Sequence, residues 1–67
     1  MKESVIIDYT NWRGERAMRR IKPIRLHFEA NAYHKGHQWM LEAIDLDKNN
    51  VLRMFAMKDI HSWQPAE

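Results

Sequence analysis

Apolar and polar residues alternate one by one in the middle of this chain, and this alternation limits the fold more than any other feature. Ile24, Leu26 and Phe28 are each followed by a polar or charged residue, in the order Arg25, His27 and Glu29. Successive side chains of a strand point to opposite faces of a sheet. The segment 24–29 is therefore predicted to be a strand with one apolar face and one solvated face.

Four other segments are predicted to be strands. β-Branched and aromatic residues dominate residues 4–11, and residues 37–44 and 51–57 are also rich in apolar side chains. Residues 16–21 alternate less cleanly and also fit a short amphipathic helix. We favour a strand for them, because Pro23 would end such a helix and the residue before a proline is biased toward extended geometry.

Turn residues separate the predicted strands. Gly14 is expected to take a positive φ and to close a hairpin. Pro23 cannot donate to a strand ladder, so it is expected to mark an edge, a bulge or a break between two strands. Residues 30–36 and 45–50 have the composition of turns, and residues 58–63 are expected to form a single helical turn.

The predicted strands follow one another at intervals of about ten residues, which is typical of small antiparallel sheets that curl into barrels. We therefore predict an all-β protein: a five-stranded antiparallel barrel or half-barrel with a short C-terminal helical turn. The domain is expected to cover residues 1–63, and residues 64–67 are expected to be a flexible tail.

The chain has 67 residues and no cysteine. A chain of this size buries only about 60% of the surface that its unfolded form exposes, and no disulfide adds stability. The lack of cysteine suits a reducing compartment, no apolar run is long enough to span a membrane, and the N-terminus lacks the apolar segment of a signal peptide. We expect a cytoplasmic protein without a membrane-spanning segment and without a cofactor.

Three stretches, YTNWRGERAMRRIKP, HQWMLEAID and VLRMFAMKDI, occur in an order and spacing that resemble the WYL domain of bacterial transcriptional regulators. The resemblance covers about residues 5–61 and implies a small Sm-like β-barrel that senses a ligand or nucleic acid. Met40 stands where the family has Tyr, and Asp59 stands where a basic residue usually precedes the Ile. The matching positions are Tyr9, Arg20, Pro23, Trp39, Leu41, Asp45, Arg53, Phe55 and Ile60.

Basic residues cluster in the first half of the chain, at Arg13, Arg16, Arg19, Arg20, Lys22 and Arg25. Arginine suits phosphate because its planar guanidinium donates two parallel hydrogen bonds. Neighbouring aromatic side chains, such as Trp12, are suited to stacking on unpaired bases. In the alternative interpretation, the arginines only solvate a strand face and protect an edge from aggregation. The predicted site for nucleic acid or another anionic ligand consists of Arg16, Arg19, Arg20, Trp39 and Arg53.

Trp39 and Arg53 also have structural interpretations. Trp39 shares a face of its predicted strand with Leu41, so it is expected to lie in the core or at its edge. Arg53 lies on a largely apolar face, where a charge is costly unless it is paired. It is therefore expected either to pair with Glu42 or Asp45 or to bind an anion.

Metal binding and catalysis have weaker support in the sequence. His27, His34, His37 and His61 have no spacing typical of zinc ligands, and exposed turn histidines are the simpler interpretation. Both serines lie near the ends of predicted elements, and a chain with two glycines has no Gly-rich phosphate loop. We expect no metal site and no enzymatic activity.

These observations together predict a regulatory binding module that acts in transcriptional regulation alongside another, DNA-binding protein. Its expected ligand is anionic, either single-stranded nucleic acid or a nucleotide. The competing hypothesis is a protein-interaction module without a small ligand, in which an edge strand pairs with a second copy of the chain in a homodimer.

Overall fold

The computed structural model describes residues 3–31 and 34–66. All neighbouring strands are antiparallel, and their order across the single sheet is β4-β3-β2-β1-β5. The predicted all-β class with five antiparallel strands is confirmed. The elements are β1 (Val5–Thr10), β2 (Arg16–Asn31), β3 (His34–Asp45), β4 (Val51–Ala56), the 3-10 turn η1 (Met57–Asp59) and β5 (Ile60–Pro65).

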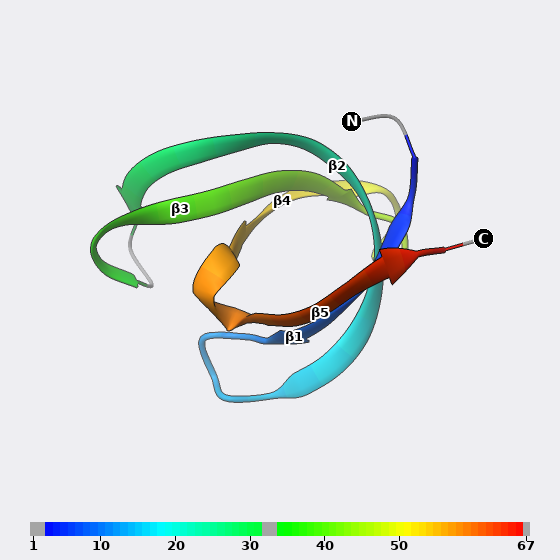
Figure 1. The fold of residues 1–67 in the computed structure, drawn as a ribbon, viewed down its shortest axis with the longest axis horizontal. Helices are drawn as coiled ribbons and strands as arrows, with labels where there is room; N and C mark the ends of the chain where they lie inside the picture. Colours follow the sequence, from blue (N-terminus) through cyan, green and yellow to red (C-terminus); the bar gives the residue numbers. More distant parts are fainter. Residues whose placement is uncertain (1–2, 32–33, 67) are drawn as a thin grey trace.

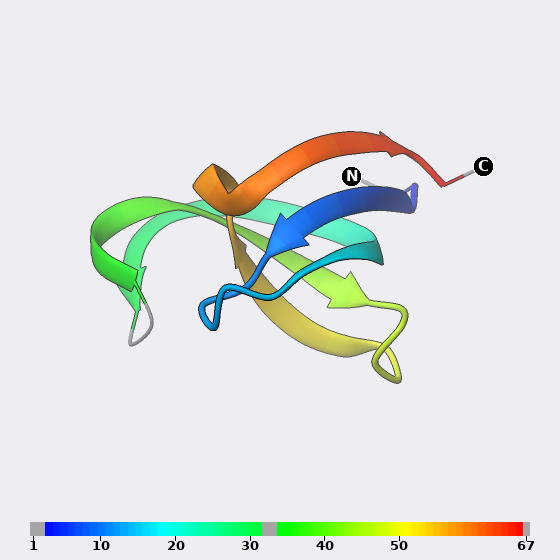
Figure 2. The same ribbon diagram turned by 90° about the horizontal axis from the view of Figure 1, so that it is seen from below.

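Strand β2 bends along its length, so that its first part pairs with β1 and its second part pairs with β3 (Figures 1 and 2). At the bend, Pro23 lies opposite Ala43 and Arg25 lies opposite Glu42, which leaves Ile24 as an extra residue. A bulge of this kind bends a strand and increases its twist. Pro23 therefore marks a bulge inside one continuous strand. Of the three roles expected for it, the bulge is confirmed, and the break between two strands is wrong.

The C-terminal segment differs from the prediction of a helical turn over residues 58–63. Helical geometry is limited to η1, and β5 pairs along β1 from Ile60, near Tyr9, to Pro65, opposite Val5. The N–H of Ala66 also donates to the carbonyl of Ser4, at 3.2 Å. Pairing with the open edge of β1 supplies hydrogen bonds that a lone helical turn lacks. The segment therefore forms the fifth strand, which extends beyond residue 63, the expected end of the domain.

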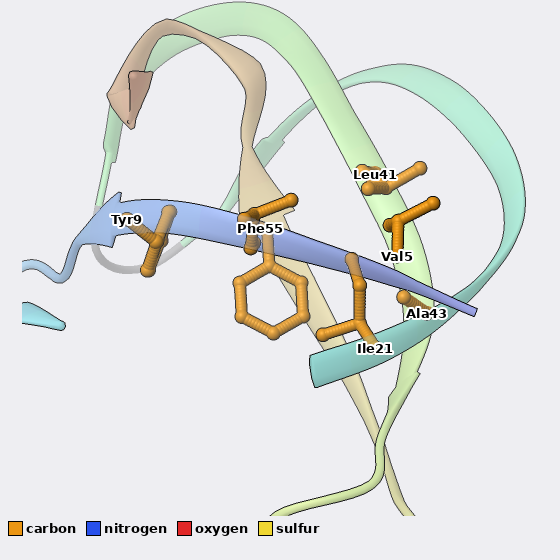
Figure 3. Packing of buried hydrophobic residues seen from close by; sticks show 7 residues of the cluster. Val5, Tyr9, Ile21, Leu41, Ala43 and Phe55 are labelled. Atoms are coloured by element: carbon orange, nitrogen blue, oxygen red, sulfur yellow. The ribbon is translucent and has the colours of Figure 1, made fainter. Parts of the chain in front are cut away.

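The core lies on the concave side of the curled sheet. The rings of Tyr9 and Phe55 meet edge to face with centroids 4.9 Å apart, an arrangement that aromatic pairs favour. Met57 and Ile60 pack against the buried cluster, so η1 and the start of β5 cover part of it. The cluster, most of which is labelled in Figure 3, consists of Val5, Ile7, Tyr9, Ile21, Leu41, Ala43 and Phe55.

Strands β2 and β3 continue past the core as a two-stranded arm (residues 28–31 and 34–39), seen at the left of Figures 1 and 2. Strand β4 pairs with β3 only as far as Met40, so no third strand supports the arm. The pairing continues to Asn31 opposite His34, through most of the segment predicted to be a turn. The turn prediction for residues 32 and 33 lies outside the described residues.

Trp39 lies on this arm and not in the core. It is opposite Phe28, with ring centroids 5.4 Å apart, and 54% of its surface is exposed. The expectation that Trp39 lies in the core or at its edge is therefore wrong. Along β3, burial continues from Leu41 only to Met40, and Met40 is also the last residue of β3 that pairs with β4.

The described residues contain no helix with the length and apolar character needed to cross a membrane.

Two leucines on neighbouring strands provide a test of the core. We expect Leu41→Ala to reduce the free energy of unfolding by about 2–5 kcal/mol, because it removes a fully buried side chain. Leu52→Ala deletes the same atoms from a residue that is 55% exposed, and is expected to stay within about 0.5 kcal/mol of the parent. Urea unfolding followed by circular dichroism measures both, and equal losses in the two variants would contradict this core.

Candidate anion-binding site

A buried carboxylate lies at the end of β3. Asp45 pairs with Ile21 on one side and Val51 on the other, which places its side chain on the concave face of the sheet. The residue is completely buried. A carboxylate in this position is costly unless cations or hydrogen bonds compensate its charge.

Two arginines from different strands converge on this carboxylate. The Nη1 atoms of Arg19 on β2 and Arg53 on β4 lie 3.6 Å and 3.5 Å from Oδ2 of Asp45. The other oxygen, Oδ1, accepts a hydrogen bond from the backbone N–H of Asp47 at 3.1 Å. Asp45 therefore joins three strands, and the expectation that Glu42 or Asp45 pairs with Arg53 is confirmed for Asp45.

The two guanidinium groups form part of a basic hollow of about 260 Å³ between the β1–β2 and β3–β4 turns. Four of its lining side chains are cationic and one, Glu15, is acidic, and the carboxylate of Asp45 lies beneath Arg19 and Arg53. Positive charge is therefore in excess. The hollow is lined by Asn11, Trp12, Arg13, Glu15, Arg19, Lys48 and Arg53.

The β1–β2 turn positions the aromatic and cationic rim of this hollow. Oδ1 of Asn11 accepts hydrogen bonds from the N–H groups of Arg13 and Glu15, both at 2.9 Å. Gly14 has a φ of 83°, which confirms the expected positive φ at this glycine. The guanidinium of Arg13 lies 5.0 Å from the ring centroid of Trp12. The turn therefore presents an indole and a guanidinium side by side.

The β3–β4 turn brings Lys48 to the opposite side of the hollow. The N–H of Lys48 donates to the carbonyl of Asp45 at 3.2 Å. Asn49 and Asn50 have φ values of 56° and 58°, in the left-handed region that asparagine tolerates. The predicted turn over residues 45–50 is confirmed by this backbone geometry.

The five residues predicted to form one site do not lie together. Arg19 and Arg53 face the hollow, whereas Arg16 and Arg20 lie on the convex face of β2, because they alternate with the inward-pointing Arg19. Phe28, the partner of Trp39, is nine positions beyond Arg19 on β2, which corresponds to about 30 Å along an extended strand. Trp39 is therefore not part of the basic hollow.

Sequence reasoning missed Lys48 and the role of Asp45 as a shared buried counter-ion, and it did not place Arg13 in the site. The parity of β2 separates Arg19 from Arg16, and that signal was readable. Lys48 belongs to a turn whose position relative to the β1–β2 turn depends on the curl of the sheet, so no local pattern points to it.

The three histidines whose side chains are described have separate partners, and the ring of His37 stacks on Phe28 with centroids 5.9 Å apart. His27 Nε2 lies 2.6 Å from Oε1 of Glu42, and His61 Nε2 lies 2.7 Å from Oγ1 of Thr10. No group of three or more potential metal ligands occurs in the part of the chain that the structure describes. His34 was also considered as a zinc ligand, and its side chain lies outside the described part of the structure.

On the convex face, Arg16 forms a pair of hydrogen bonds with Asp8, at 2.9 Å and 2.8 Å. These bonds are the largest cause of the lowered pKa of the Asp8 carboxyl. Because the folded state lowers this pKa, the pair stabilises the fold above the carboxyl's ordinary pKa. Its contribution is lost as the pH falls through the lowered value.

We expect Arg16→Ala to raise the pKa of Asp8 toward its ordinary value, as measured by an NMR pH titration of the carboxyl carbon. Arg20→Ala is the matched control, because Arg20 lies on the same face of β2 without contacting Asp8 in the described structure. An equal rise in both variants would show that net charge, and not this contact, lowers the pKa.

Comparison with known proteins identifies the family. The WYL domain family model matches residues 1–65. Searches of curated proteins and of solved structures returned no significant match. The match covers nearly the whole chain and agrees with the resemblance found in the three sequence stretches. The chain therefore belongs to the WYL domain family.

Proposed function

We propose that this WYL domain is a regulatory binding module that recognises an anionic ligand in the basic hollow. The observation that carries the proposal is the convergence of Arg19 and Arg53 on one buried carboxylate, with Arg13 and Lys48 on the rim. One carboxylate cannot neutralise two guanidinium groups. The excess charge faces a hollow that is open to solvent, where an incoming anion gains both Coulomb attraction and hydrogen bonds.

Single-stranded nucleic acid or a nucleotide is the ligand class that suits these residues best. A phosphate carries the charge that the guanidinium groups attract, and the Nε of Arg19 is a buried donor without an acceptor among the described residues. Trp12 is 57% exposed at the rim. An indole in this position offers an apolar face for a base, and such stacking contributes about 1–3 kcal/mol per base.

We further propose that the module binds its ligand without catalysing a reaction on it. Apart from Glu15, which accepts a hydrogen bond from Asn11 at 3.0 Å, the lining is amide, indole and cationic side chains. Guanidinium groups do not release protons at physiological pH and therefore supply no general base. In this proposal the domain acts in the cytoplasm, and its occupancy is transmitted to transcription through another, DNA-binding protein.

The decisive experiment compares two double variants: one lacks two positive charges of the hollow, and the other lacks two positive charges of the convex face. We expect Arg13→Ala/Lys48→Ala to weaken binding of a fluorescein-labelled oligothymidylate at least roughly fivefold, because phosphate contacts dominate such affinities. Arg16→Ala/Arg20→Ala removes the same net charge and is expected to change the affinity less than about twofold, since screening reduces distant charges.

Fluorescence anisotropy at about 50 mM and about 200 mM salt measures both effects. If each rim residue contacts one phosphate, the slope of log affinity against log salt becomes shallower by about 1.4 in the hollow variant. Equal weakening in the two double variants would reject the hollow as the site. Absence of binding by the parent at low salt would reject nucleic acid as the ligand.

A specific observation also favours self-association as a second function. Strand β4 is an edge of the sheet, and Val51 and Leu52 on it are 48% and 55% exposed. An apolar edge of this kind is a template for pairing with another chain. We expect light scattering to show a dimer that Leu52→Lys returns to the monomer, and a monomeric parent would rule this function out.

A further inference from the structure

The contacts of Asp45 differ between its two oxygens. Oδ1 accepts a well-formed hydrogen bond from the N–H of Asp47 at 3.1 Å, which fixes the start of the β3–β4 turn. Oδ2 lies 3.5–3.6 Å from the guanidinium nitrogens of Arg53 and Arg19, beyond the usual hydrogen-bond range. This buried oxygen has no hydrogen-bond partner among the described residues. The two arginines are thus attracted to Asp45 without being locked to it by hydrogen bonds.

The arginines differ in how far they reach solvent. The side chain of Arg19 is 15% exposed and that of Arg53 is 37% exposed. The guanidinium of Arg53 also lies 5.8 Å from the ring centroid of Phe55, which supports its position above the core. Both side chains line the hollow, and the Nε of Arg19 has no acceptor among the described residues.

We propose that Asp45 is a positioning residue of the anion site: it holds Arg19 and Arg53 toward the hollow, and it competes with the ligand's anionic group for them. This inference rests on the proposed function. Two guanidinium groups beside an apolar core need a counter-charge while the site is empty. The internal carboxylate supplies that charge, but it also cancels part of the field that a ligand experiences.

Competition with an internal carboxylate determines which anions bind well. A single carboxylate on a ligand offers the arginines no more charge than Asp45 already does. A phosphate offers more acceptor oxygens and, as a monoester, close to two negative charges at neutral pH. Phosphate groups are therefore better able than carboxylate groups to displace Asp45 from the two arginines, and Asp45 links occupancy of the hollow to the β3–β4 turn through the N–H of Asp47.

The variant Asp45→Asn separates this role from a structural one. Asparagine keeps an oxygen for the N–H of Asp47 and has nearly the same shape, but it removes the negative charge. A residue that only supports the turn gives unchanged or weaker anion binding when it is replaced. A competing counter-ion gives tighter binding. The matched control is Asp8→Asn, which removes one negative charge at a carboxylate whose ion pair is with Arg16 on the convex face, outside the hollow.

The binding experiment uses fluorescein-labelled oligothymidylate and, separately, inorganic phosphate and acetate as probes. We expect Asp45→Asn to bind the oligonucleotide and phosphate at least roughly fivefold more tightly than the parent, the change that about 1 kcal/mol of unit-charge interaction across 4 Å of water produces. Asp8→Asn is expected to match the parent. Inorganic phosphate is expected to gain more affinity than acetate, because removal of a unit negative charge relieves more repulsion for the more highly charged anion.

Unchanged or weaker binding by a folded Asp45→Asn variant, with the parent still binding the oligonucleotide and phosphate, overturns the inference and leaves the proposed function standing. If the parent binds neither the oligonucleotide nor phosphate, the proposed function fails and the inference fails with it. Should Asp45→Asn be unfolded in plain buffer, circular dichroism during a phosphate titration replaces the binding assay. Recovery of the fold at phosphate concentrations that barely stabilise the parent supports the inference, and no recovery overturns it.

NMR spectra of the parent provide a second readout. Phosphate that draws Arg19 and Arg53 away from Oδ2 changes the electrostatic environment of the carboxylate that accepts from Asp47. The backbone amide resonance of Asp47 is therefore expected to shift during a phosphate titration of the parent and to shift less in Asp45→Asn. An amide that does not respond in the parent contradicts the link to the turn.

Discussion

The bulge at Ile24 is the constraint on which the rest of the structure depends. A short chain without disulfides has little apolar surface to bury, and this one builds its core by curling a single sheet around it. Strand β2 makes this possible because it pairs with β1 before the bulge and with β3 through it and beyond. The bend turns the inward faces of β1 and β3 toward each other, and the ring of Phe55 fills the space beside Tyr9 (Figure 3).

The same curl sorts the charged residues by face. Arg19 shares a face of β2 with the core residue Ile21, and Arg53 shares a face of β4 with Phe55, so their charges are held at the margin of the apolar interior beside Asp45. Arg16 points the other way and is neutralised by Asp8 in solvent. The basic stretch of the sequence is therefore not one patch: the concave part has a charge excess in a confined space, whereas the convex part is spread over an exposed strand.

The two positions that depart from the WYL pattern have simple environments. Met40, where the family has Tyr, is completely buried, so a side chain without a hydroxyl is compatible with its surroundings. Asp59 pairs with the neighbouring Lys58 at 3.1 Å on η1. Neither residue lines the basic hollow. Of the positions that match the family pattern, Arg53 lines the hollow and Asp45 lies beneath it, whereas Arg19 and the residues of the rim are outside that pattern.

Local patterns in the sequence determined the strand composition, the turn chemistry at Gly14 and at residues 45–50, the all-β class and the family. These features depend on side-chain alternation and on backbone preferences that act over a few residues. Tertiary structure alone decided that Pro23 lies in a bulge, that the last segment becomes β5, and that Trp39 is left on an exposed arm. It also decided which arginines share Asp45. Each of these outcomes depends on which strand ends lie opposite one another, and a period-two pattern specifies the face of a residue but not its neighbour across the sheet.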